Sequence, residues 1–428
     1  MSMQVIEQYE SVVRSYCNNF PTVFEKAVGS CLYDTEGRRY LDFFAGASVL
    51  NYGHNHPALK KKLIEYIEND GITHSLDMAS SAKVDFLQTF EDLILKPRGM
   101  NYKVQFPGPA GTNSVEAALK LARKIKGREK IISFTNAFHG MTLGALSVTG
   151  NAFKRSGAGL PLNYSDSMPY CGYFGEDVDT IEYLERFLED SGSGVDDSAA
   201  VIVETIQAEG GIKVAEQKWL QDLQALCRKH DMLFIVDDIQ VGCGRTGPFF
   251  SFEEAGLDPD IICLSKSLSG YGHPIAVTLL RPELDQWEPG EHNGTFRGNN
   301  LAFVTATEAF KQFWADDKLT QEVKAKAELV AQALNKLVAQ FPQAKGEVRG
   351  RGLLQGIAFE NADIAGTVSA VAFENGLIIE TSGPEGEVLK LLPPLTITEA
   401  ELKEGLDIIE RSLGEALKRL GISSKEAV

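Results

Sequence analysis

The sequence is poor in several features that define large classes of protein. Its six cysteines are scattered over 428 residues with no Cys-x-x-Cys pair, so neither a disulfide framework nor a zinc site is expected. The N-terminus lacks the basic and apolar blocks of a secretory signal, and no apolar run reaches membrane-spanning length. We therefore expect a cytoplasmic protein with reduced thiols and no membrane partner.

Positive charge and histidine are also scarce. The chain has 42 Lys and Arg against 59 Asp and Glu, a formal charge of −17, which argues against nucleic acid as a partner. The pair His54 and His56 stands among Gly53, Asn55 and Pro57, which indicates a turn rather than a ligand pair. We expect no metal site.

Two apolar runs near the middle of the chain end in charged residues. The run at 233–236 is followed by Asp237 and Asp238, and the run at 261–264 by Lys266. Parallel sheets bind their ligands at the carboxyl ends of strands. A lysine amine with a nearby aspartate suits the aldehyde and the ring nitrogen of pyridoxal phosphate. Taken alone, a lysine in this place is more often solvated.

The segment after Asp237 contains a pattern that suggests a different cofactor. Gly242, Gly244 and Gly247 fit G-x-G-x-x-G, which binds dinucleotides only where it opens a helix after a strand. Here the pattern continues into Pro248-Phe249-Phe250, which cannot form the first turn of an amphipathic helix. A dinucleotide site is therefore excluded by context.

A loop of small residues, 105–112, leads into a helical stripe of apolar residues at 115–125. Asn113 and Glu116 have the spacing of a capping box. A helix N-terminus reached in this way offers free N–H groups to a phosphate, although a simple tight turn explains the loop equally well. The loop does not match G-x-x-x-x-G-K-[ST], so a nucleoside triphosphate is not implied.

Alternating strand and helix patterns between residues 103 and 280 predict an α/β fold with a parallel sheet. Strands are expected near 103 and at 130–134, 200–203, 232–236 and 261–264, with a helix at 218–229. The N-terminal part predicts a helix at 6–16, strands at 23–28, 31–34 and 39–42, and a helix at 59–67. From residue 301 onward a smaller α+β domain is expected, with helices at 302–314, 321–341, 364–374 and 399–420 and strands at 352–359, 377–380 and 388–392.

Several separated motifs resemble those of one family. They are Gly53-His-Asn-His-Pro57, Gly111-Thr112, Glu116-Ala-Ala-Leu-Lys120, Phe138-His139-Gly140, Glu204-Thr-Ile-Gln-Ala-Glu209-Gly-Gly211, Asp237-Asp-Ile-Gln240, Ser265-Lys266, Gly294-Thr295-Phe296, Gly350-Arg-Gly352-Leu and Pro393-Pro394-Leu395. In this order and spacing the chain resembles the class III aminotransferases, which are fold-type I pyridoxal phosphate enzymes. The resemblance implies a seven-stranded, mostly parallel sheet. It also implies three regions: an N-terminal segment (1–56) that joins the small domain, a large cofactor-binding domain (57–300), and a linking helix with the small domain (301–428).

The resemblance also implies roles for individual residues. Lys266 would bond to the cofactor aldehyde and move the proton, and Asp237 would keep the ring nitrogen protonated. The other cofactor-binding positions would be Gly111 and Thr112 (phosphate), Phe138 (ring face), Gln240 (ring oxygen), His139 and Glu204. Thr295 would reach the phosphate of a second subunit, which implies a homodimer or a larger assembly with shared sites. As alternatives, Phe138 is a core aromatic and Thr295 a turn residue.

Three further positions bear on the substrate. Relatives that act on ornithine or 4-aminobutyrate usually carry Arg where this chain has Met141, and many carry Arg in place of Lys390; Glu209 resembles the acidic partner of the latter. With FFAGASVLNYGHNHP and LKLLPPLTIT, the chain is most similar to the diaminobutyrate–2-oxoglutarate aminotransferases of ectoine biosynthesis. These move the amino group of glutamate to aspartate 4-semialdehyde.

Other functions stay open at this point. Within the family, the alternative is an ornithine, acetylornithine or 4-aminobutyrate aminotransferase. An aminomutase or racemase can share the same fold, because the cofactor motifs do not determine the outcome of the reaction. A binding protein without turnover and an NAD oxidoreductase are the alternatives from other classes.

Overall fold

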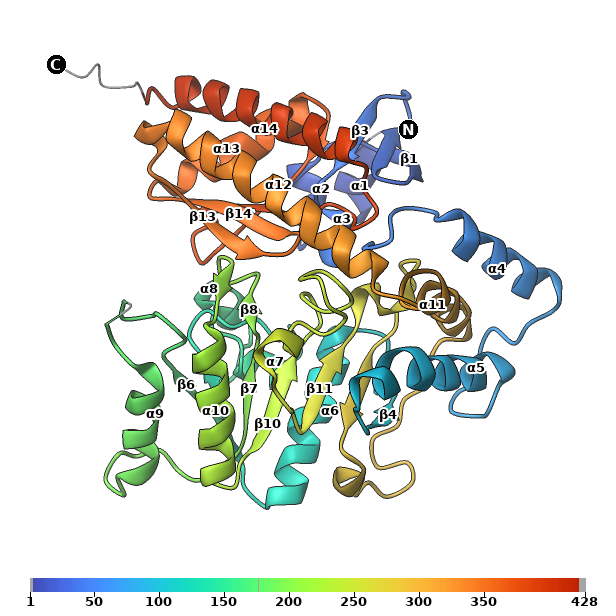
Figure 1. Ribbon diagram of the computed structural model, residues 1–428, viewed down its shortest axis with the longest axis vertical. Helices are drawn as coiled ribbons and strands as arrows, with labels where there is room; N and C mark the ends of the chain where they lie inside the picture. The colour runs from blue at the N-terminus through green and yellow to red at the C-terminus, as the bar shows by residue number, and fades with distance from the viewer. Residues whose placement is uncertain (1–2, 176, 423–428) are drawn as a thin grey trace.

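A computed structural model describes residues 3–175 and 177–422, and Figure 1 shows two bodies stacked along its long axis. The lower body is built on a seven-stranded sheet in the order β4-β12-β11-β10-β7-β5-β6. Its strands are β4 (Lys103–Gln105), β5 (Lys130–Phe134), β6 (Ser165–Met168), β7 (Ser198–Val203), β10 (Leu233–Asp237), β11 (Ile261–Leu264) and β12 (Val277–Leu280). Only β12 runs against its neighbours, so the predicted sheet, seven-stranded and mostly parallel, is confirmed.

Helices cover both faces of this sheet, which explains why its central strands are apolar throughout. All residues of β7, β10 and β11 are buried, as expected for parallel strands with helices on both sides. The helices of the lower body are α5 (Ser81–Phe90), α6 (Gly111–Lys126), α7 (Leu143–Ser147), α8 (Ala152–Ser156), α9 (Thr180–Glu189) and α10 (Gln217–Lys229). A short hairpin, β8 (Ile206–Gln207) with β9 (Lys213–Val214), follows β7.

The upper body joins both ends of the chain. A four-stranded antiparallel sheet in the order β13-β14-β17-β16 lies beneath long helices. Its elements are β13 (Gly346–Arg351), β14 (Leu354–Phe359), β16 (Glu380–Ser382), β17 (Val388–Leu391), α12 (Lys318–Gln340), α13 (Ala362–Glu374) and α14 (Glu399–Arg419). The N-terminal strands β1 (Phe24–Val28), β2 (Cys31–Asp34) and β3 (Arg39–Asp42) form a second sheet, to which β15 (Leu377–Ile378) adds in parallel.

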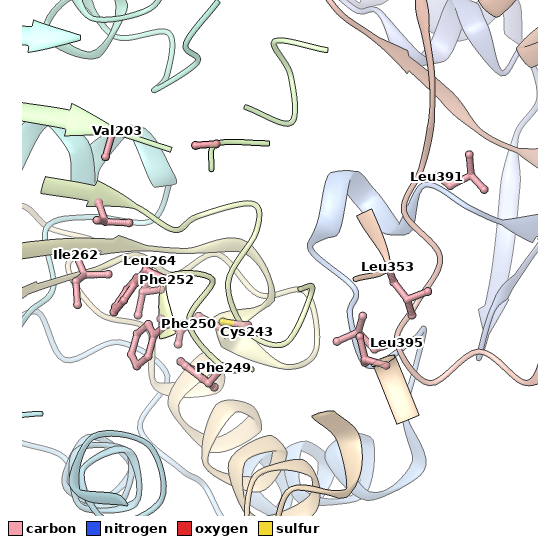
Figure 2. Packing of buried hydrophobic residues seen from close by; sticks show 14 of the residues in the cluster. Val203, Cys243, Phe249, Phe250, Phe252, Ile262, Leu264, Leu353, Leu391 and Leu395 are labelled. Atoms are coloured by element: carbon pink, nitrogen blue, oxygen red, sulfur yellow. The ribbon is translucent and has the colours of Figure 1, made fainter. Parts of the chain in front are cut away.

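Two linking elements connect the bodies. They are α4 (Pro57–Glu68) and α11 (Asn300–Phe313). Apolar packing is continuous across the junction, because one cluster of buried residues contains Phe249 and Phe250 of the lower body together with Leu353 and Leu395 of the upper (Figure 2). The predicted domain boundaries at residues 56 and 300 stay predictions. Among the described residues, no helix has the length and apolar character needed to cross a membrane.

One expectation about local structure was wrong, and the strands β6 and β13 were missed. The helix predicted at 6–16 is two short helices, α1 (Met3–Tyr9) and α2 (Tyr16–Asn19), neither of which buries a side chain. β6 was missed because its sequence, SDSM, is polar, as an edge strand of the sheet can be. The strand predicted at 352–359 is the second half of a hairpin whose first half, β13, is a charged strand, GEVRGR.

Candidate active site

The carboxyl ends of four adjacent strands meet at one cavity. Phe138 and His139 follow β5, Glu204 follows β7, Asp237 ends β10 and Lys266 follows β11. Every predicted cofactor-binding residue of this chain except Thr295 lines the cavity, namely Gly111, Thr112, Phe138, His139, Glu204, Asp237, Gln240 and Lys266. Its volume is about 170 Å³, and a cavity of about 150 Å³ is known to hold a benzene ring. A substituted aromatic ring therefore fits.

Lys266 carries the amine of the site on a strained backbone. It has a φ of 52°, an unusual value for a residue other than glycine, and such strain collects at functional sites. Its Nζ donates to the carbonyl of Ala47 at 2.9 Å. Burial lowers the pKa of Lys266 to about 8, against the opposing effect of Glu209. The buried amine therefore loses its proton at a lower pH than an exposed lysine does.

Asp237 is held by a buried histidine. His139 Nδ1 lies 2.7 Å from Asp237 Oδ2, so the ring must donate this hydrogen bond if the aspartate is ionised. The backbone N–H of Ile239 donates to the other oxygen at 3.2 Å. Nε2 of His139 is buried without a partner among the described residues. The pair provides a fixed negative charge at the cavity wall.

Glu204 adds a second carboxyl group to this wall. It is buried, and its Oε2 accepts the backbone N–H of Phe138 at 3.0 Å. Burial raises the pKa of Glu204 well above its usual value, and the nearby Asp237 raises it further. Glu204 is therefore neutral over a wider range of pH than an exposed glutamate, which limits repulsion between the two carboxyl groups.

The N-terminus of α6 forms one end of the cavity. A Cβ added to Gly111 would lie 3.1 Å from Ile239 side-chain carbons, and one added to Gly140 would overlap Thr112, so both glycines permit a close approach of backbone. The first N–H groups of a helix have no partner within it and attract anions. The predicted capping box was wrong: Asn113 accepts the N–H of Ala110 from the third helical position, and Glu116 binds Thr142 and Ala145 instead.

Phe138 lines the cavity, and its ring is in contact with the amine of Lys154. Lys154 Nζ lies 4.1 Å from the centre of this ring, which is a cation–π distance. Phe138 lines the cavity and Lys154 does not. Phe138 is only partly buried, which disfavours its interpretation as an ordinary core aromatic.

Gln240 connects the cavity to its rim. Its Nε2 donates to Glu209 Oε1 at 3.0 Å and to the Ala47 carbonyl at 3.2 Å. Its Oε1 is buried without a partner among the described residues. The amide thus has bonding capacity left for a ligand, although its two donor hydrogens are already engaged.

Glu209 and Lys390 form an ion pair that belongs to a larger buried cluster. Lys390 Nζ lies 2.7 Å from Glu209 Oε1 and 3.0 Å from Glu380 Oε1, and the lysine side chain is fully buried. Glu380 also accepts the hydroxyl of Tyr16 at 3.2 Å. Burial opposes the charge on Lys390, but the two carboxylates outweigh it and raise its pKa. Despite burial, Lys390 lowers the pKa of Glu209 to about 2.

Neither Glu209 nor Lys390 lines the cavity itself, and the two remaining predicted residues, Met141 and Thr295, do not line it either. Met141 is 54% exposed and follows the Phe138 loop. Thr295 is exposed in a loop whose neighbour, Phe296, is also exposed. Its carbonyl accepts from His74 at 2.9 Å. A role for Thr295 at a cofactor therefore requires a second copy of the chain.

A larger groove of about 500 Å³ lies between α12 and α14. It is lined by leucines such as Leu334, Leu337, Leu402 and Leu406 and by surface charges including Lys403 and Glu410. It lies on the upper body, away from the strand ends of the large sheet (Figure 1). We assign it no part in the reaction.

The residues present fit pyridoxal phosphate. The helix N-terminus suits its phosphate, the Asp237–His139 pair its ring nitrogen, the Phe138 ring its face, and the Lys266 amine its aldehyde. The sequence interpretation missed Ala47, Lys154 and Glu380. For Glu380 a signal existed, because β16 and β17 are neighbouring strands in which Glu380 and Lys390 are register partners.

Comparison with known proteins finds relatives over nearly the whole chain. A family model described as "Aminotransferase class-III" matches residues 12–413. A diaminobutyrate–2-oxoglutarate transaminase of Virgibacillus pantothenticus is 57% identical over 97% of the chain and 100% of that protein. One from Halalkalibacterium halodurans is 59% identical over 96% of each. Among solved structures, an ornithine aminotransferase of Toxoplasma gondii is 29% identical, with a TM-score of 0.84 over 97% of this chain and 94% of that one.

Proposed function

We propose that this chain, which belongs to the class III aminotransferase family, transfers the terminal amino group between 2,4-diaminobutyrate and the glutamate/2-oxoglutarate pair, in both directions. The comparisons confirm the expected fold, the transaminase class and pyridoxal phosphate as the cofactor. In the biosynthetic direction the amino acceptor is aspartate 4-semialdehyde. The observation that carries the proposal is the similarity, over nearly the whole length, to enzymes of that name.

When bound, pyridoxal phosphate supplies an aldehyde carbon that bonds to amines and a ring that withdraws electrons from the reacting carbon. The protein supplies the proton transfers. Lys266, with a pKa of about 8, is suited to accept a proton from the substrate carbon and to return it, because a general base works best when its pKa is near the working pH.

The other site residues hold charge and orientation. Asp237, fixed by His139, is suited to hold a proton at the ring nitrogen, and this keeps the ring an electron acceptor. The N–H groups at Gly111 and Thr112 are suited to bind the phosphate. Phe138, which lines the cavity, is suited to press on the ring face and exclude water.

The rim of the cavity supports a diamine as substrate. Glu209 is an ionised carboxylate that acts directly on the charge of Lys266, so a second ammonium group on the substrate meets negative charge there. Met141 offers no cation to a distal carboxylate. Lys390 is buried behind Glu209 and shared with Glu380, so it is a weaker carboxylate site than a free arginine fork.

An ornithine aminotransferase is the second candidate, supported by the structural similarity to the Toxoplasma enzyme. Ornithine is also a diamine, longer by one methylene. The Toxoplasma enzyme is 29% identical to this chain, whereas the two diaminobutyrate enzymes are 57% and 59% identical. This difference favours the shorter substrate, 2,4-diaminobutyrate.

The proposal includes a homodimer with shared sites. Thr295 and Phe296 are exposed on one loop, and α1 buries none of its side chains, which supports a surface that a second copy covers. Mixing Thr295→Ala with Lys266→Ala subunits tests it. The mixed dimer should contain one intact site and regain activity above both parents, and mixtures no more active than the separate variants would contradict sharing.

The proposal also includes a cytoplasmic location and a place in ectoine biosynthesis. All six cysteines are free thiols, which supports a reducing compartment. The acidic surface is compatible with a cell that makes osmolytes.

A direct experiment tests the activity. The purified protein should show a visible absorbance band that hydroxylamine removes, and it should convert 2,4-diaminobutyrate and 2-oxoglutarate to equal amounts of aldehyde product and glutamate. Absence of glutamate with this pair, in protein that shows the absorbance band, would contradict the proposed substrates.

A further inference from the structure

Residues 45–48 form a left-handed turn beside the cavity. Their φ angles are 47°, 59°, 57° and 72° for Ala45, Gly46, Ala47 and Ser48. Residues other than glycine rarely adopt this conformation, because the Cβ approaches the following carbonyl oxygen. Strained backbone of this kind persists only where its surroundings hold it in place. The turn must therefore be anchored at both ends.

Asp42 anchors the beginning of the turn. Its Oδ1 accepts the backbone N–H groups of Phe44 and Ala45, each at 2.8 Å. Its Oδ2 lies 2.7 Å from Nε2 of His54. Asp42 itself is the last residue of β3, so this anchor is part of a sheet.

Arg245 anchors the end of the turn. Its Nε donates to Ser48 Oγ at 3.0 Å, and Nη2 donates to Asn51 Oδ1 at 2.6 Å. Its Nη1 donates to the carbonyls of Leu353 at 3.0 Å and Pro393 at 2.6 Å. One guanidinium thus ties the N-terminal segment to the lower body, where Arg245 lies, and to the upper body.

Arg245 is an unusual choice for a purely structural bond. The side chain is completely buried, and no carboxylate pairs with it within the described ranges. Burial lowers the pKa of Arg245 to about 9, with only Asp42 acting in the opposite direction. A buried charge without an opposite partner weakens a fold, so stability alone does not account for it.

The turn presents one carbonyl to the reacting groups. Ala47 O accepts from Lys266 Nζ at 2.9 Å and from Gln240 Nε2 at 3.2 Å. A carbonyl acceptor favours the protonated form of an amine. The charged groups that act on Lys266 are Glu209, Lys390, Glu380 and Asp237. Of these surroundings, only the carbonyl depends on Arg245.

We propose that Arg245 is a positioning residue for Lys266: by fixing the turn at residues 45–48, it aims the Ala47 carbonyl at the lysine amine whenever that amine is not bonded to the cofactor. The inference rests on the role given to Lys266 in the proposed function. It gives a role to Arg245 of the GCGRTG segment. Exclusion of the dinucleotide site had left this segment without a function.

Competitive labelling of the full-length, cofactor-free protein with an amine-reactive reagent over a range of pH gives the pKa of Lys266 by mass spectrometry. Arg245→Lys keeps the positive charge but loses the planar guanidinium that donates to several acceptors at once. It should lower the pKa of Lys266 by about one unit, the equivalent of losing the hydrogen bond from Lys266 to Ala47. Arg128→Lys is the matched control. Arg128 also donates to backbone carbonyls, those of Ser198, His230 and Asp231, far from the cavity, and its variant should leave Lys266 unchanged.

A folded Arg245→Lys protein whose Lys266 titrates as in the wild type would overturn the inference, whatever happens to its melting temperature. If this variant does not fold, Ser48→Ala removes one anchoring oxygen and should shift the pKa in the same direction by a smaller amount; no shift there would overturn it too. Labelling needs no substrate, so failure of the proposed transaminase assay is a separate outcome.

Discussion

The cofactor end and the substrate end of the cavity differ in how their charged groups are held. At the cofactor end, Asp237 and Lys266 stand at the ends of neighbouring parallel strands, β10 and β11. At the substrate end, Glu209 follows the lower sheet whereas Lys390 and Glu380 lie on the upper one. The first set is fixed within one sheet, and the second is joined across two bodies by ion pairs.

This difference separates chemistry from selectivity. Strand ends in a buried sheet hold catalytic groups in one geometry, which catalysis by proton transfer and charge stabilisation requires. The ion pairs at the substrate end lie outside that sheet, so a substitution there should leave the geometry of the strand ends in place. Substitutions at the cofactor end should therefore lower activity with every substrate, and substitutions at the substrate end should change stability and substrate preference.

Lys266→Ala should give the largest effect. In the proposed mechanism the amine is both covalent anchor and proton carrier, so its loss should lower kcat by about 10³-fold or more with all amines. The folded protein should still bind the phosphate-bearing cofactor through α6. Steady-state rates and equilibrium dialysis of the cofactor measure both, and a variant with more than about a tenth of the wild-type rate would refute the assignment.

Asp237→Asn should lower kcat by roughly 10²- to 10³-fold, because it removes the negative charge that stabilises the protonated ring. Asp238→Asn is the matched control. Asp238 is the adjacent buried carboxyl group, bonded to Ser251, and burial raises its pKa to about 7. It does not line the cavity, so its variant should lose little activity. Equal losses of activity in both variants would show that removal of any buried carboxylate lowers activity, whatever its position relative to the cavity.

Lys390→Met should act on stability. It leaves Glu209 and Glu380 buried without their cation, which costs about 3–5 kcal/mol in the free energy of unfolding. In the wild type, the pKa of Glu209 is lower in the folded protein than in the unfolded chain. The resulting stability is present at pH values above the unfolded pKa and is lost as the pH falls toward the folded pKa of about 2. In the variant, burial without a cation raises the pKa of both Glu209 and Glu380. Protonation of these two groups at low pH therefore restores stability.

The gap in melting temperature between wild type and Lys390→Met should therefore be widest near neutral pH and narrow as pH falls. Lys403→Met, which breaks an exposed pair with Asp407, is the control and should leave the melting temperature nearly unchanged. A gap that is constant with pH would argue against charge as the cause.

Met141→Arg should give the smallest effect, and only on preference. A guanidinium at this exposed position offers a fork to a distal carboxylate, so kcat/KM for 4-aminobutyrate should rise relative to 2,4-diaminobutyrate by about 5- to 10-fold, or roughly 1 kcal/mol. Met141→Leu is the control for size. An unchanged ratio would place residue 141 outside the substrate path.

Strand patterns alone predicted Asp237 and Lys266 at the cofactor end, whereas Glu209 and Lys390 came only from the family resemblance and Glu380 was not predicted. Asp237 and Lys266 each follow an apolar run that only a buried parallel strand explains, so their meeting follows from sheet topology. The Tyr16–Glu380 bond joins residues 364 positions apart, and Arg245 contacts residues from 48 to 393. Such contacts depend on how segments that are distant in the sequence pack together, which no local pattern encodes.

Local strain was hidden for a similar reason. Ala45, Ala47 and Ser48 are ordinary residues whose left-handed backbone is imposed by Asp42 and Arg245. The family resemblance supplied Glu209 and Lys390, but the sequence did not reveal that Lys390 is shared with Glu380.

The most direct test of the account is kcat/KM of the wild-type enzyme for 2,4-diaminobutyrate, ornithine and 4-aminobutyrate with 2-oxoglutarate as acceptor. We expect 2,4-diaminobutyrate to be preferred by about 5- to 150-fold, since one misplaced hydrogen-bonded contact costs roughly 1–3 kcal/mol. A higher value for ornithine would contradict the diaminobutyrate assignment and leave the chain an ornithine aminotransferase.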